Sequence, residues 1–167
     1  AVMFDVSHLG TVRVEGPEAL AVLQRTLTND LTKVAPGRAQ YTHLLDETDA
    51  SVIDDIIIWW IAPEVFDVMP NASNTGGVRS AVGGADTTET RSVIAVQGPR
   101  AKERLTDVLP AAAQIGRFRV EHASWNGVAC TVAGTGYTGE AGVEIAVPAA
   151  AAADLWNSIA AAGVFFV

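Results

Sequence analysis

The sequence predicts an α+β fold built from two related modules. A short motif that begins at Val14 begins again at Val96, and each copy is followed by the same order of strand-like and helical segments. The chain is 49% apolar and only 18% charged, which is enough to form a sizeable core in 167 residues. We expect each module to run strand, helix, strand, strand, strand, helix, with modules at residues 1–84 and 85–167.

The repeated motif is VEGPEA at residues 14–19 and VQGPRA at residues 96–101, with a leucine four residues after each. Gly-Pro is expected to end a strand, and proline to open the helix in its first turn, where its missing N–H costs nothing. The copies lie about 80 residues apart, which is longer than a solenoid unit and typical of a duplicated half-domain. Coincidence within a common strand–turn–helix pattern is the alternative.

The elements that follow the motif also repeat. Two strands are predicted after each first helix, at residues 41–45 and 52–61 in the first copy and at 118–123 and 128–133 in the second. A third strand and a helix close each copy, at residues 66–70 and 71–82, then at 143–148 and 149–162. We expect the two sheets to face each other or a shared cavity.

Composition and charge exclude several classes of function. The formal charge is −8 and no run of Lys or Arg is present, which argues against a nucleic-acid partner. The longest apolar stretch, Val52–Ala62, is shorter than the roughly 20 residues of a membrane span, and no signal peptide is visible. A single Cys130 and the isolated His43 and His122 predict neither a disulfide nor a metal site. We therefore expect a cytoplasmic protein without membrane or metal.

Residues 134–139, GTGYTG, match the G-x-G-x-x-G pattern of dinucleotide sites. A dinucleotide fingerprint must open a helix, whereas these glycines lead into a strand-like segment that begins at Gly142. The pattern therefore indicates a long turn that brings Tyr137 against a flat partner.

Asp54 and Asp55 lie inside an otherwise apolar strand. Burying a carboxylate is costly without a partner, so at least one should meet a cavity, a ligand or a backbone donor. Neighbouring strand residues point to opposite faces, so the two are not expected to act as one acid–base pair. Asp55 shares its face with Ile57 and Trp59. The alternative is that both cap a turn or pair with an arginine.

Other polar residues have simple structural interpretations. Glu144 is opposite the core face of its strand, so a solvent-facing glutamate is the alternative to a ligand contact. Asn71 and Asn74 stand at the start of a helix, where asparagine normally caps.

Seven motifs, in order and spacing, resemble those of the glycine cleavage T-protein family. The resemblance spans nearly the whole chain, with Ala50-Ser51 standing where the family has Gly-Gly. Sequence ahead of Ala1 and a C-terminal barrel domain are absent, so we interpret the chain as a fragment truncated at both ends, and the sequence does not establish whether the fragment alone is active. The motifs are FDVSHLG at 4–10, LTND at 27–30, GRAQY at 37–41, VIDD at 52–55, PNASN at 70–74, VQGP at 96–99 and GYTGE at 136–140.

The resemblance implies tetrahydrofolate-dependent aminomethyl transfer from the lipoyl arm of the H-protein in glycine catabolism, giving 5,10-methylenetetrahydrofolate and ammonia. It assigns the catalytic carboxylate to Asp55, and folate-lining positions to Tyr41, Asn71, Tyr137 and Glu144. A glutamate can accept the donor edge of a pterin, and aromatic rings suit its flat face.

Three alternatives stay open: a non-catalytic folate-binding module, a folate-dependent demethylase, and the folate domain of a sarcosine-type dehydrogenase. The VIDD motif favours aminomethyl transfer over the demethylases. Asp54 is expected to act mainly through stability.

Overall fold

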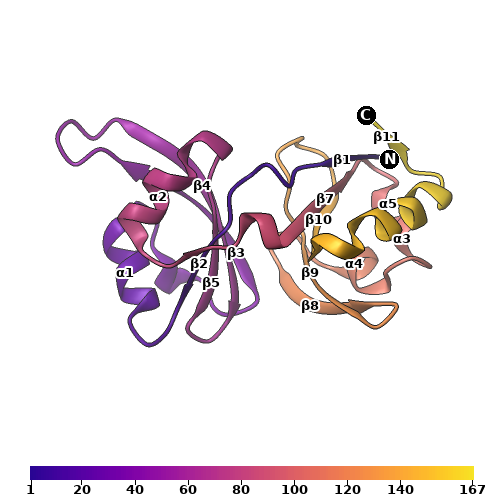
Figure 1. The fold of residues 1–167 in the computed structure, drawn as a ribbon, viewed down its shortest axis with the longest axis horizontal. Helices are drawn as coiled ribbons and strands as arrows, with labels where there is room; N and C mark the ends of the chain where they lie inside the picture. The colour runs from indigo at the N-terminus through magenta and orange to yellow at the C-terminus, as the bar shows by residue number, and fades with distance from the viewer. The chain divides into compact units, whose positions relative to one another are not determined.

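The computed structural model describes all residues, Ala1–Val167, and the chain divides into two compact units (Figure 1). The first unit is His8–Thr88, and the second unit joins Ala1–Ser7 to Glu89–Val167. None of the helices is both long and apolar enough to cross a lipid bilayer.

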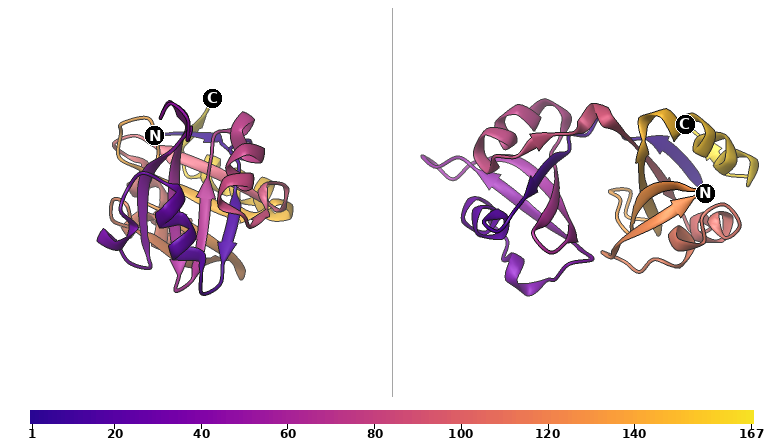
Figure 2. Two further views of the ribbon diagram at one scale, coloured as in Figure 1. Left: turned by 90° about the vertical axis from the view of Figure 1, so that its left-hand side faces the viewer. Right: turned by 60° about the horizontal axis from the view of Figure 1, so that its bottom comes forward.

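The first unit holds an antiparallel sheet in the order β3-β4-β5-β2-β6, with α1 and α2 packed on one face (Figure 2). Leu23 of α1 and Val78 of α2 join Ile56, Ile58 and the other inward residues of the strands in one core. The elements are β2 (Val12–Glu15), α1 (Ala19–Thr26), η1 (Leu31–Lys33), β3 (Arg38–Leu45), β4 (Val52–Ala62), β5 (Val65–Met69), η2 (Ala72–Asn74), α2 (Thr75–Val82) and β6 (Ala85–Asp86).

The second unit holds a six-stranded sheet in the order β11-β1-β7-β10-β9-β8, antiparallel except for the β1–β11 pair. Its core joins Leu105, Ile145 and Leu155. The elements are β1 (Val2–Asp5), η3 (Thr88–Thr90, which begins in the first unit), β7 (Arg91–Gln97), α3 (Ala101–Leu105), α4 (Pro110–Gln114), β8 (Val120–Trp125), β9 (Val128–Ala133), β10 (Gly142–Pro148), η4 (Ala149–Ala151), α5 (Ala152–Ala161) and β11 (Phe165–Phe166).

Sheet topology confirms the predicted α+β fold with an internal repeat. The order β2-β5-β4-β3 in the first unit matches β7-β10-β9-β8 in the second, strand for strand. The turns of the repeated motif also match, since Gly16 has φ 108° and Gly98 has φ 114°. In each turn the carbonyl of that glycine accepts the N–H of the alanine three residues on, at 3.0 Å and 2.9 Å. Glycine is needed here because other residues rarely adopt positive φ.

The division of the chain differs from the expected boundary at residues 84 and 85. Strand β1 pairs with β7 through Met3↔Val96, so the first seven residues belong to the second unit. Strand β6 pairs with β2 through Val12↔Asp86, so the first unit extends to Thr88. Each repeated sheet thus gains a flanking strand from the segment that precedes the other copy.

Two local expectations were wrong. Pro17 and Pro99 lie in the turn before the helix instead of in its first turn, because the Gly-Pro step closes a hydrogen-bonded turn first. Phe118 has φ 54° and therefore cannot continue a strand, so β8 begins at Val120.

Strand β4 positions the two central carboxylates. The buried residues Ile56 and Ile58 alternate with Ile57 along the strand, as a pleated strand with a helix-covered face requires. Asp54 is 3% exposed, whereas Asp55 is exposed. The register Asp55↔His43 and Ile57↔Tyr41 places two ring-bearing residues of β3 beside Asp55.

Candidate functional site

The exposed carboxylate of Asp55 is held by two side chains. The Tyr41 hydroxyl donates to Asp55 Oδ2 at 2.9 Å, and Asn71 Nδ2 donates to Asp55 Oδ1 at 2.7 Å. Tyr41 comes from the neighbouring strand β3, and Asn71 follows β5. Both carboxylate oxygens therefore have a donor, which restricts the side chain to one orientation on an open surface.

Asp54 is bound by three amide donors. It accepts the backbone N–H of Asn71 at 3.0 Å, Asn71 Nδ2 at 2.8 Å and Asn74 Nδ2 at 2.9 Å. No cation pairs with it, so neutral donors alone satisfy a carboxylate that is almost fully buried. The expected alternative of an arginine partner for Asp54 is therefore wrong, whereas the expected backbone donor is present.

Asn71 joins the two carboxylates. Its Nδ2 lies 2.8 Å from Asp54 Oδ1 and 2.7 Å from Asp55 Oδ1, so one amide group contacts both side chains although they start on opposite faces of the strand. Asn71 is the N-cap residue of η2 but makes no side-chain capping bond. The capping expectation is therefore wrong at Asn71: its Nδ2 group is turned toward the two carboxylates, and its side-chain oxygen accepts no N–H of η2.

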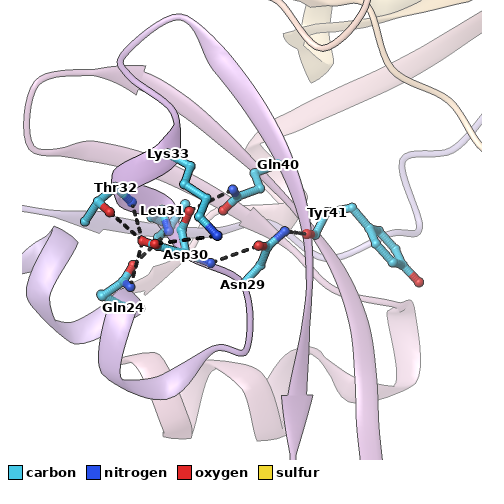
Figure 3. Close-up of polar contacts among 8 residues, drawn as sticks. All are labelled: Gln24, Asn29, Asp30, Leu31, Thr32, Lys33, Gln40 and Tyr41. Carbon is cyan, nitrogen blue, oxygen red and sulfur yellow. Dashed lines mark hydrogen bonds and ion pairs between the residues drawn. The ribbon is translucent and has the colours of Figure 1, made fainter.

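The backbone of β3 at Tyr41 is held by hydrogen bonds to the segment that precedes η1. Asn29 Nδ2 donates to the Tyr41 carbonyl at 2.8 Å, and Gln40 Nε2 donates to the Asp30 carbonyl at 3.0 Å. Figure 3 shows this network on one side of β3 and the Tyr41 ring projecting away from it. Since β3 is an edge strand, these bonds satisfy backbone groups that no neighbouring strand reaches.

The hydrogen bonds fix the charge of the Tyr41–Asp55 pair. The Tyr41 hydroxyl, with smaller help from Asn71 and His43, lowers the pKa of Asp55, because donors stabilise the ionised carboxylate. The same bond raises the pKa of Tyr41. Asp55 is therefore an anion at neutral pH, and Tyr41 keeps its proton.

A second polar cluster lies in the second unit around Gln97, which is 1% exposed. Gln97 Nε2 donates to the carbonyls of Thr135 at 3.2 Å and Val143 at 3.1 Å, and Gln97 Oε1 accepts the Thr138 hydroxyl at 2.9 Å. The amide thereby ties both ends of the loop between β9 and β10 to the sheet. The glycine-rich loop leads into β10, so it is a turn and not the start of a helix.

Glu144 is buried on β10. It is 4% exposed and accepts the hydroxyl of Thr135, so the expected alternative of a solvent-facing glutamate is wrong. Burial raises the pKa of Glu144, and the Thr135 bond and the charge of Arg91 oppose that rise. A further hydrogen-bond donor would stabilise the ionised form of this buried carboxyl group.

We predict that Glu144→Gln stabilises the chain at neutral pH. Because the pKa of Glu144 is higher in the folded chain than its ordinary value of 4.5, the folded state is most stable at a pH below 4.5. Its stability then falls as the pH rises through the pKa that Glu144 has in the folded chain. The amide stays neutral and still accepts from Thr135. The unfolding midpoint above that range should rise by roughly 2–4 °C, the range for about 1 kcal/mol at this size.

Thermal scans from pH 4 to pH 8 test this prediction, with the exposed Glu140→Gln as the matched control. The Glu144→Gln and wild-type curves should converge at pH 4, while Glu140→Gln follows wild type throughout. A stability gain for Glu144→Gln that does not depend on pH contradicts the argument.

A cavity of about 270 Å³ lies beside the loop in the second unit. Lys102, Arg117 and Thr135 line it, but Tyr137 and Glu144 do not. Tyr137 is 68% exposed and its ring centroid lies 6.5 Å from that of Phe4. The expectation that Tyr137 and Glu144 line one cavity is therefore not met by this cavity.

The structure brings Tyr41, Asp55 and Asn71 into direct contact. It places Tyr137 on a loop and Glu144 on the strand that follows, with no hydrogen bond between them. Sequence reasoning missed Gln97 as a buried anchor. The repeat could have drawn attention to it, because the equivalent position in the first copy is the exposed Glu15.

The comparisons with known proteins agree with one another. The GCVT N-terminal domain family matches residues 1–166. Aminomethyltransferases of Chlorobaculum parvum and Parafrankia sp. are each 42% identical, over 96% and 94% of this chain and 47% and 45% of their own length. A probable aminomethyltransferase of Halobacterium salinarum is 38% identical over 95% of this chain and 47% of its own length. The chain thus spans about half the length of these relatives.

Two solved structures have the same fold. The sarcosine oxidase of Corynebacterium sp. U-96, a heterotetramer, aligns with a TM-score of 0.66 at 18% identity, over 96% of this chain and 82% of that chain, which is a likeness of fold alone. The glycine cleavage system aminomethyltransferase T of Bartonella henselae aligns with a TM-score of 0.87 at 30% identity, over 99% of this chain and 47% of that one. The chain therefore belongs to the GCVT N-terminal domain family, together with the aminomethyltransferases that it resembles over nearly its whole length.

Proposed function

We propose that this chain forms the folate-binding part of a tetrahydrofolate-dependent aminomethyltransferase that acts in glycine cleavage. The observation that carries the proposal is the Asp55 carboxylate, which is exposed, ionised and held through both oxygens by Tyr41 and Asn71. Family membership supports the same reaction class. Asp55 is the proposed catalytic residue, and Tyr41, Asn71, Tyr137 and Glu144 are the proposed folate contacts.

A fixed anion suits the chemistry of aminomethyl transfer. Asp55 can accept a hydrogen bond from the nitrogen of an incoming aminomethyl group and turn its methylene carbon toward the attacking folate nitrogen. The same carboxylate can relay a proton to the departing amine. Because the donors of Asp55 keep its pKa low, it works as an oriented acceptor more than as a strong base.

The residues proposed for folate contact fit its chemistry. Glu144 is a buried carboxyl group that can accept the amino and N–H donors of a pterin, and such donors would offset the burial that raises its pKa. Tyr41 and Tyr137 are 48% and 68% exposed, so each offers a ring face to a flat ligand. Tetrahydrofolate supplies two nitrogens, N5 and N10, to receive the one-carbon unit.

The proposed donor is the aminomethyl group on the lipoyl arm of an H-protein. The methylene carbon gains bonds to N5 and N10 of folate, and its bonds to sulfur and to the amino nitrogen break. The two protons that leave the folate nitrogens go to the lipoyl thiol and to ammonia. The products are 5,10-methylenetetrahydrofolate, ammonia and the dihydrolipoyl H-protein.

The test uses the natural gene product that contains this chain. It is mixed with aminomethylated H-protein and tetrahydrofolate, and the formation of ammonia and methylenetetrahydrofolate is followed. We expect both products in equal amounts and none without the H-protein. Folate binding without turnover supports the non-catalytic module instead, and folate-dependent turnover of sarcosine or dimethylglycine without the H-protein supports the demethylase or dehydrogenase alternatives.

A further inference from the structure

We propose that Asp54 is a positioning residue that holds the Asn71 amide in the orientation in which it binds Asp55. This inference deepens the proposed function, because it assigns a role to the buried neighbour of the proposed catalytic carboxylate. It replaces the expectation that Asp54 acts mainly through stability.

The geometry at Asn71 supports a directional role. Asp54 takes both the backbone N–H and the side-chain amide of Asn71, at 3.0 Å and 2.8 Å, so it fixes the residue at two points. Only an NH₂ group can donate to two carboxylates, so the amide must turn its nitrogen toward Asp54 and Asp55. With Asp54 in place, the second N–H of Asn71 is directed at Asp55 Oδ1 at 2.7 Å.

The burial of these side chains indicates which residue orients the others. Asp54 is 3% exposed and also accepts Asn74 Nδ2 at 2.9 Å, so its own position is set by the strand and by three donors. Asn71 and Asp55 are exposed, so packing restrains them less than it restrains Asp54. The rigid buried group therefore orients the exposed pair, as supporting residues do in preorganised sites.

The groups that face Asp55 are few, which makes its titration a clean readout. Tyr41 and His43 approach from β3, and Asp54 precedes it on β4. The helix η2 carries no titratable side chain, and the only one on β5, Asp67, pairs with Trp59 further along β4. Loss of the Asn71 donor would favour the protonated form of Asp55 and raise its pKa.

The experiment is a double-mutant cycle of Asp54→Asn and Asn71→Ala, with the Asp55 carboxyl carbon titrated by NMR in the folded chain. The asparagine at position 54 keeps the shape, but its amide cannot accept all three donors. We expect Asn71→Ala to raise the Asp55 pKa, because a donor is lost. Asp54→Asn removes a like charge, which lowers the Asp55 pKa, and also the support of Asn71, which raises it. The charge effect alone is measured by adding Asp54→Asn to Asn71→Ala, so the Asp55 pKa of the Asp54→Asn single variant should be higher than that charge effect gives. Additive shifts of the two changes overturn the proposal.

The matched control is Asp67→Asn. Asp67 is another buried carboxylate of the same sheet, bound by Arg13 Nε at 2.5 Å and Nη2 at 3.0 Å, and it makes no contact with Asn71. Asp67→Asn should lower the unfolding temperature and leave the Asp55 titration unchanged. If Asp54→Asn folds poorly, Asp54→Ser takes its place in the cycle, because a hydroxyl cannot serve both donors of Asn71.

Turnover gives an independent readout in the natural gene product. In Asp54→Asn, misplacing the proposed catalytic carboxylate should slow the reaction roughly 10-fold to 100-fold. The acid limb of the pH profile should then lie higher than the loss of the Asp54 charge alone would place it. A purely structural role lowers stability and moves that limb only by the effect of the charge. Because the NMR titration needs no substrate, failure of the proposed function, seen as an Asp55→Asn protein that is as fast as wild type, remains distinguishable from failure of the positioning role.

Discussion

Asp55→Asn should reduce aminomethyl transfer by about 10²–10⁴ while leaving the fold and most folate affinity intact. The amide has nearly the shape of the carboxylate, so Tyr41 can still donate to it. It carries no charge, however, and it can neither stabilise a developing cation nor relay a proton. The loss should fall on kcat more than on KM, because the interaction strengthens only as the transition state forms.

Steady-state rates measured beside thermal unfolding test this prediction. Thr48→Ala, on an exposed turn of the same unit, serves as the control for handling and should keep the wild-type rate. An Asp55→Asn protein with undiminished turnover would remove Asp55 from its proposed role. A slow Asp54→Asn protein beside a fast Asp55→Asn protein would transfer that role to the neighbour.

Gly136→Ala should destabilise the second unit by roughly 2–5 kcal/mol. Gly136 has φ +143°, which an L side chain rarely adopts, and an added Cβ would lie 2.4 Å from Gln97 Oε1. Gln97 is buried and already bonded to both ends of the loop, so it cannot move without leaving the carbonyl groups of Thr135 and Val143 unpaired. The cost of the backbone strain at position 136 therefore adds to the cost of the lost Gln97 hydrogen bonds.

Gly139→Ala provides the comparison for this prediction. Gly139 has φ +80° in the same loop, but nothing lies within 4 Å of the added Cβ, so only conformational strain of about 1–2 kcal/mol is expected. Hydrogen exchange of the β7 and β10 amides measures both variants within the second unit. Equal losses from the two substitutions would show that contact with Gln97 does not matter.

The order of secondary structure was predictable from the sequence because each module repeats one motif and one series of elements. The Gly-Pro turns at Gly16 and Gly98 have nearly the same φ, so local chemistry determined them. The partners of β1 and β6 were not predictable. These strands are four and two residues long, too short for a pattern, and each pairs with a strand far away in the sequence.

The candidate site was predictable in its residue types more than in its contacts. Alternation along β4 correctly placed the side chains of Asp54 and Asp55 on opposite faces, but the strand is apolar on both faces, so the pattern did not show which of the two is buried. Alternation could not show that a single Asn71 amide contacts both, because that depends on how the chain leaves β5. Likewise, the hydroxyl that bonds Glu144 belongs to Thr135, whose carbonyl accepts the buried Gln97 amide, and no pattern within β10 encodes these partners.

The exchanged flanking strands make the first unit an insertion in the second. Residues 8–88 leave the second unit after Ser7 and return to it at Glu89. Close to both points, the Val6 N–H donates to the Val93 carbonyl at 2.9 Å. The two ends of the inserted segment are joined by a hydrogen bond in which the Thr87 N–H donates to the Thr11 carbonyl at 2.9 Å. During synthesis, β1 must therefore wait until the whole insertion has emerged before β7 is available. A first unit that folds early shortens the loop that this late pairing must close, and so lowers its entropic cost.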